Sequence, residues 1–147
     1  MEINRSNIKY IEWRTTEDLH EDIVNCISEL RFIRDEQQFL EDLIRSYTMD
    51  LLGGDLYEKS KEVIGKLSDS RKALTPLQRK LIAHNNNLEV LLDENDIPCE
   101  IEDYKEDHYQ LMFEVASYYS KFKKVKRRIF NLIKKIMKDA KQKRLLN

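Results

Sequence analysis

Apolar side chains recur along residues 104–136 at alternating intervals of four and three residues. Nine of the ten positions in this seam are apolar or aromatic, and the tenth is a histidine: Tyr104, His108, Leu111, Val115, Tyr118, Phe122, Val125, Ile129, Leu132 and Ile136. A mean interval of 3.5 residues places these side chains on one side of an α-helix, where other helices must cover them. The pattern predicts a long helix over residues 100–146 that packs in a bundle.

A second seam with the same spacing lies in the N-terminal third of the chain. Its only strongly polar member is Gln37: Leu19, Ile23, Cys26, Leu30, Ile33, Gln37, Leu40, Ile44, Tyr47 and Leu51. Thr15 and Thr16 precede two acidic residues, which is typical of a helix start. Gly53 and Gly54 form a pair suited to a helix end and turn. The first helix is therefore expected over residues 16–52.

The middle segment carries two signals that disagree. Eight apolar residues keep one heptad phase, which favours one helix over residues 55–95: Leu56, Val63, Leu67, Leu74, Leu77, Leu81, Leu88 and Leu91. Pro76, preceded by Thr75, favours a helix start instead, because a proline inside a helix costs about 3 kcal/mol. Since the phase does not slip across the proline, we expect one helix kinked near Pro76. The alternative is a chain reversal at Pro76, which would give a four-helix bundle.

These elements predict an all-α fold, an elongated up-down-up antiparallel three-helix bundle with coiled-coil-like seams. Residues 1–14 show no clean period and are expected to form an arm, with residues 15–147 as a single bundle domain. Counting levels from the two turns places Gln37 beside Ser70 and Val125, so a buried hydrogen bond between Gln37 and Ser70 is expected. Cys26 and Cys99 fall at different levels and are expected to be free thiols.

Charge is divided unevenly along the chain, although the formal net charge is only −1. Residues 1–120 hold 14 basic and 26 acidic side chains, a net charge of −12, whereas residues 121–147 hold 12 and 1, a net charge of +11. The candidate binding residues are the cations of this basic end that lie off the seam: Lys124, Arg127, Arg128, Lys134, Lys135, Lys138, Lys141, Lys143 and Arg144. The competing interpretation is that acidic residues of the first two helices, such as Glu36 and Glu62, neutralise these cations within the bundle.

The function expected from this pattern is a non-enzymatic protein-interaction or scaffold module. Its partner is expected to be another protein or a second copy, since Phe39 and Leu43 with Phe130, Ile133 and Met137 extend the apolar face beyond a simple seam. One alternative is that residues 121–147 bind nucleic acid or an anionic membrane surface. No apolar run approaches the roughly 20 residues needed to cross a bilayer. No signal peptide is evident either, so a cytoplasmic location is expected.

Catalytic chemistry finds no sequence support, and no cofactor is expected. The chain has no glycine-rich phosphate loop, no Cys-x-x-Cys pair and no Gly-x-Ser-x-Gly motif. A metal-binding bundle that uses His20, His84 and His108 is a second alternative, because Glu17 and His20 have the spacing found in di-iron bundles. That motif occurs once here and not twice, so these histidines are expected to occupy structural positions and no metal ligand is assigned.

Overall fold

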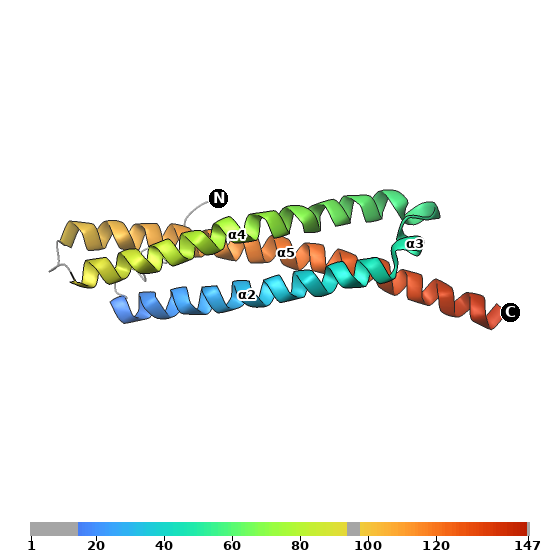
Figure 1. Ribbon diagram of the computed structural model, residues 1–147, viewed down its shortest axis with the longest axis horizontal. Coiled ribbons are helices and arrows are strands. Elements are labelled where there is room, and N and C mark those ends of the chain that lie inside the picture. Colours follow the sequence, from blue (N-terminus) through green and yellow to red (C-terminus); the bar gives the residue numbers. More distant parts are fainter. Residues whose placement is uncertain (1–14, 94–97, 147) are drawn as a thin grey trace. The chain divides into compact units, whose positions relative to one another are not determined.

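The computed structural model describes residues 15–93 and 98–146, which are almost entirely helical and contain no strand (Figure 1). The helices are α2 (Thr16–Ser46), α3 (Thr48–Leu51), α4 (Tyr57–Asp93) and α5 (Pro98–Leu146), with a 3-10 turn η1 (Gly54–Leu56) before α4. The predicted all-α class is confirmed for this part of the chain. The arm expected at residues 1–14 lies outside the described residues.

The ends of α2 follow the capping chemistry of its sequence. Thr15 Oγ1 accepts a hydrogen bond of 3.1 Å from the backbone N–H of Asp18, and the Asp18 carboxylate accepts one of 3.2 Å from the backbone N–H of Thr15. This reciprocal pair satisfies two of the backbone donors that a helix start leaves unpaired. The helix ends at Ser46, earlier than expected, and α3 and η1 connect it to α4 with Gly54 at a φ of 58°, a value that favours glycine.

Helix α4 continues through Pro76 without a break from Tyr57 to Asp93. The chain therefore does not reverse at Pro76, which is the reversal on which the four-helix alternative rested, and the number of helices in the bundle stays a prediction. Pro76 is exposed, so its ring lies on the outer side of the helix and displaces no core side chain. The unbroken heptad phase was the better guide here. The expected kink stays a prediction.

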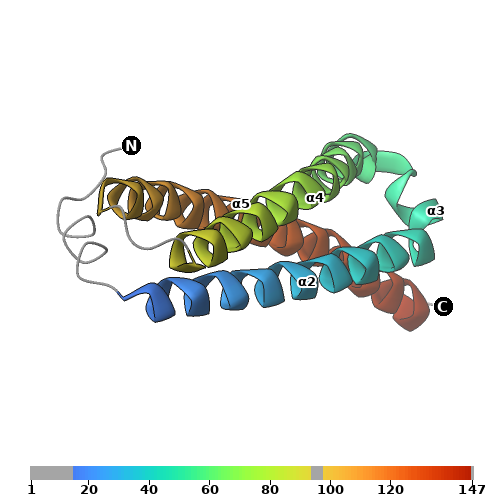
Figure 2. The ribbon, with the colours of Figure 1, turned by 60° about the vertical axis from the view of Figure 1, so that its left-hand side comes forward.

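The described residues form two compact units, each built from segments of α2, α4 and α5. Unit 1 contains residues 15–31, 74–93 and 98–117, and unit 2 contains residues 32–73 and 118–146. Within each unit, hydrogen bonds join all three helical segments. Figure 2 shows the ribbons of α2, α4 and α5 from a second side. Each unit is described separately below.

Buried apolar residues come almost entirely from the predicted seams. Those of unit 1 are Leu19, Ile23, Leu30, Leu74, Leu77, Leu81, Leu88, Tyr104, Leu111 and Val115. Those of unit 2 are Ile33, Leu40, Leu51, Val63, Leu67, Phe122, Val125, Ile129, Ile133 and Ile136. Ile133 alone among them lies outside a seam. In the part of the chain that the structure describes, no helix has an apolar stretch long enough to cross a membrane.

Candidate functional site

A buried polar cluster joins the three helices of unit 1. His84 Nε2 lies 2.9 Å from His108 Nδ1, and His108 Nε2 lies 3.0 Å from a carboxylate oxygen of Asp22. The Tyr104 ring stacks on His84 with 4.1 Å between centroids, and its hydroxyl donates a 2.9 Å hydrogen bond to the His84 carbonyl oxygen. His108 has no exposed surface and His84 is 7% exposed. We call these four residues the histidine cluster.

The hydrogen-bond pattern of the histidine cluster indicates which ring nitrogens carry protons. The Asp22 carboxylate can only accept a hydrogen bond, so His108 donates this bond from Nε2. In a neutral His108 ring, Nδ1 then carries no proton and accepts the hydrogen bond that His84 donates from Nε2. Burial, together with the neighbouring His108, lowers the pKa of His84 to about 4. Burial also raises the pKa of Tyr104 well above its ordinary value. His84 and Tyr104 are therefore uncharged at neutral pH.

This arrangement does not fit a metal centre. His84 and His108 point ring nitrogens directly at each other at 2.9 Å, whereas a metal bound between them would hold each nitrogen about 2 Å away on its own side. His20 is instead bonded through Nδ1 to Asn85 at 2.9 Å. Among the described residues, no group of three or more His, Cys, Asp or Glu side chains is arranged to hold a metal ion.

Cys26, the described cysteine of unit 1, is not suited to act as a nucleophile. Cys26 is a free thiol that donates a 3.5 Å contact to the sulfur of Met112. Burial, followed by the charges of Glu29 and Asp22, raises the pKa of Cys26 to about 11. A thiol with this pKa is protonated at neutral pH and is a weak nucleophile. Cys99, the other expected free thiol, lies among side chains that the structure does not describe.

A second buried polar cluster joins the three helices of unit 2. Gln37 Nε2 donates to Ser70 Oγ at 3.0 Å and to the Tyr118 hydroxyl at 2.8 Å. Tyr118 in turn donates to the Ser70 carbonyl oxygen at 2.7 Å. Gln37 is only 1% exposed, so its amide depends on these partners. The hydrogen bond predicted between Gln37 and Ser70 is confirmed, whereas the contribution of Tyr118 was not predicted.

The nine predicted binding residues all lie on α5 in unit 2, and eight of them are exposed: Lys124, Arg127, Lys134, Lys135, Lys138, Lys141, Lys143 and Arg144. The spacing of Lys124, Arg127, Lys134, Lys138 and Lys141 places these five on the side of α5 opposite its buried seam. We call the eight exposed residues the cationic face. Within residues 32–73 and 118–146, none of the eight takes part in an ion pair.

Four of the ten acidic residues in the described part of unit 2 are paired with cations outside the cationic face. The ninth predicted residue, Arg128, is half-buried and contacts Glu62 at 3.3 Å. Lys126 bonds Glu36 at 2.6 Å, and Arg71 pairs with Glu41. Neutralisation within the bundle therefore holds for the sides of α5 that border α2 and α4. It does not extend to the cationic face.

The apolar flank of unit 2 is divided between core and surface. Ile133 is buried, at 4% exposure, whereas Phe39 and Met137 are each 56% exposed and Phe130 is 43% exposed. Phe32, one heptad before Phe39, is 64% exposed as well. Exposed aromatic residues beside unpaired cations are typical of protein-binding surfaces.

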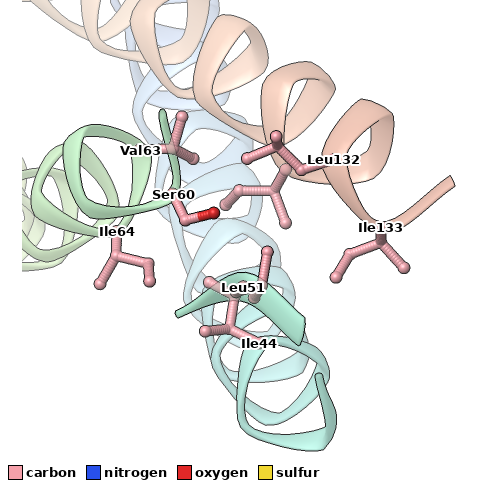
Figure 3. Close-up of a pocket in the computed structure, with 8 residues that line it drawn as sticks. Ile44, Leu51, Ser60, Val63, Ile64, Leu132 and Ile133 are labelled. Carbon is pink, nitrogen blue, oxygen red and sulfur yellow. The ribbon is translucent and has the colours of Figure 1, made fainter. Parts of the chain in front are cut away.

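A small cavity in unit 2 contains one unsatisfied hydroxyl. Ser60 has no exposed surface, and its Oγ has no hydrogen-bond partner among the described residues. Apolar side chains of α2, α3, α4 and α5 surround it, and the space they leave for a water molecule is about 10 Å³. Figure 3 shows the Ser60 oxygen directed inward among Leu51, Val63 and Leu132. This space is too small for an organic ligand.

Comparisons with family models, curated proteins and solved structures found no match to this chain. The candidate site is therefore defined by its own residues. The sequence placed His84 and His108 at seam positions of adjacent helices, but their hydrogen bond and the contributions of Asp22 and Tyr104 were not predicted. The signal that could have indicated them is that buried imidazoles require polar partners.

Proposed function

We propose that this chain is a non-enzymatic helical interaction module that binds an acidic protein surface through the cationic face of α5. The observation that carries the proposal is that eight cations of α5 are exposed and take part in no ion pair among the described residues of unit 2. Surfaces with strong single-sign charge attract partners of opposite charge and accelerate their association.

The proposed scaffold is an up-down-up three-helix bundle with coiled-coil seams, and its location is cytoplasmic. Burial of the seam residues in both units supports the bundle. The free thiol of Cys26 is compatible with a reducing compartment. A rigid bundle suits an interaction module, because the binding side chains lie on a helix that the core already orders.

The role proposed for the basic end is protein binding and not catalysis. The buried polar clusters are engaged in internal hydrogen bonds, and the thiol of Cys26 is protonated at neutral pH. On the same helix as the cationic face, the exposed Phe130 and Met137 offer apolar contact area of the kind that supplies affinity in protein interfaces, and Phe39 is exposed on α2.

The proposal is tested by affinity capture from a native extract with two matched triple variants. The cation-reversed variant carries Lys124→Glu, Arg127→Glu and Lys134→Glu on α5. The control carries Lys59→Glu, Lys61→Glu and Lys72→Glu, which makes the same change in net charge at exposed positions of α4 in the same unit. A partner that is recovered by the wild type and the control but lost by the cation-reversed variant supports the proposal.

Binding must then be reproduced with the captured protein in purified form. Weakening with added salt is expected, because the interaction is largely electrostatic. Duplex DNA and vesicles containing phosphatidylserine serve as competing probes. If the chain binds either probe tightly but does not bind the purified captured protein, the proposal is contradicted and a nucleic-acid or membrane ligand is favoured. Equal capture by the two triple variants would also contradict it.

A further inference from the structure

Net charge also differs in sign between the two units. The described residues of unit 1 hold four basic and 13 acidic side chains, a net charge of −9. Those of unit 2 hold 19 basic and 10 acidic side chains, a net charge of +9. The described part of each copy therefore carries one acidic unit and one basic unit.

Unit 1 presents an acidic counterpart to the cationic face, and it does so on the same helix. In the first half of α5, Glu102, Asp103, Glu106 and Asp107 are all exposed. None of these four takes part in an ion pair within the described part of unit 1. We call them the acidic face. The intervals of three and four residues between them place neighbouring carboxylates side by side along the helix.

We propose that the chain associates with a second copy of itself, the cationic face of one copy binding the acidic face of the other. The inference rests on the proposed function, for which it names the partner. A second copy is favoured because it offers unpaired carboxylates with helical spacing that matches that of the cations. Each copy contributes both faces, so two copies can form two equivalent contacts and close a two-fold dimer.

The register of such a contact follows from helix geometry. Antiparallel α5 helices that bring Glu106 of one copy beside Arg127 of the other also bring Glu102 within about one turn of Lys134. The same register brings Phe113, which is 39% exposed, beside Ser120, a small exposed residue. Phe113 then contributes apolar contact between the charged stretches, and the small serine permits close approach.

The test uses the full chain, with association measured by sedimentation equilibrium and overall helicity by circular dichroism. The wild type is expected to dimerise at about 50 mM salt and to associate at least roughly tenfold more weakly at about 500 mM, where screening is stronger. The cation-reversed variant defined above is expected to be monomeric. An acid-reversed variant, Glu102→Lys with Asp103→Lys and Glu106→Lys, is expected to be monomeric too.

Mixing the two reversed variants is the decisive arm of the experiment. In each variant the contact positions of the two faces, 124, 127 and 134 on one and 102, 103 and 106 on the other, carry charges of the same sign. That sign is negative in the cation-reversed variant and positive in the acid-reversed variant, so the equimolar mixture is expected to form heterodimers. A wild type that is monomeric at low salt, or a mixture that stays monomeric while both variants keep wild-type helicity, would overturn the inference. The control with reversed charges on α4 is expected to dimerise like the wild type, and its failure to do so would also count against the inference.

The two proposals fail in distinguishable ways. If the wild type is monomeric at low salt but the cation-reversed variant still loses a captured partner, self-association is rejected and protein binding by the cationic face stands. If the wild type dimerises and the cation-reversed variant dimerises equally well, the cationic face is not the contact surface, and the self-association inference is rejected in this form.

Discussion

The histidine cluster should make the stability of the protein fall as the pH drops below 6.5. The pKa of His84 is about 4 in the folded protein against 6.5 for the free side chain, because burial disfavours its charged form. Between these values the unfolded chain binds a proton that the folded chain does not. The contribution of His84 to stability is therefore complete above pH 6.5 and is lost as the pH falls toward 4.

The size of this effect follows from the pKa difference. Each pKa unit corresponds to about 1.4 kcal/mol, so a shift from 6.5 to about 4 corresponds to a total loss of roughly 3 kcal/mol of stability once the pH is below both values. At pH 5, where the free side chain is mostly protonated and the folded one is mostly not, the expected loss is about 2 kcal/mol. That loss is a large fraction of the 5–15 kcal/mol that typically separates folded from unfolded proteins.

Urea unfolding followed by circular dichroism at pH 7.5 and pH 5 measures this loss. His84→Phe keeps a ring against Tyr104 but cannot titrate, and His84→Gln keeps a polar neighbour for His108. In both variants the difference in unfolding free energy between the two pH values should be about 2 kcal/mol smaller than in the wild type. The other acidic groups, including Asp22, are common to all three proteins, so their titration largely cancels in the comparison.

His20→Gln is the matched control, because it removes an exposed histidine of the same unit. Its pH dependence should equal that of the wild type. Identical losses between pH 7.5 and pH 5 in the wild type and both His84 variants would refute the reasoning, since the cluster would then not hold His84 in its neutral form.

Two further outcomes test the polar groups of unit 2. Ser60→Ala should stabilise the protein by about 1 kcal/mol more than the control Ser68→Ala, because it removes a buried hydroxyl without a partner, whereas Ser68 is exposed on the same helix. If urea unfolding shows that the two variants change the free energy of unfolding equally, or that Ser60→Ala is the less stable, the Ser60 hydroxyl is satisfied. Tyr118→Phe should destabilise the protein by about 1–3 kcal/mol, since it leaves the Ser70 carbonyl oxygen without the hydroxyl that donates to it, whereas Gln37→Leu should cost less because Ser70 and Tyr118 remain bonded to each other. Equal costs for these two variants would contradict the hydrogen-bond pattern described.

The heptad seams were predictable because burial along a helix depends on residue spacing alone. Ser60 and His84 occupy seam positions and are buried despite their polarity. Burial therefore follows the heptad phase on both sides of Pro76. The ends of the helices were less predictable. Tyr47 continues the seam, but it lies in a turn between α2 and α3, and the connection to α4 then contains Gly54 at a positive φ.

Contacts between helices were harder to predict than burial within them. The axial register of two neighbouring helices depends on how the connection between them is folded. A heptad seam does not determine this register, because it repeats every seven residues. The interaction of Gln37 with Ser70 was predicted, yet Val125 was named as their neighbour on α5 and the hydroxyl comes from Tyr118. No partner was predicted for Asp22, which lies beside the seam and not in it.

The buried polar clusters favour one axial register of the helices, which the repeating apolar seams do not. If α5 slid by one heptad within unit 2, an aliphatic side chain such as Leu111 or Val125 would replace Tyr118 beside Gln37, and apolar burial would be little changed. The Gln37 amide would nonetheless lose its 2.8 Å bond to Tyr118, and the Ser70 carbonyl oxygen would lose its 2.7 Å bond, at about 0.5–1.5 kcal/mol for each hydrogen bond lost. In unit 1 the same slide would separate His108 from both His84 and Asp22. Each unit thus carries its own penalty against a shifted register, and within each unit this penalty fixes which residues of α2 and α4 lie level with the charged residues of α5.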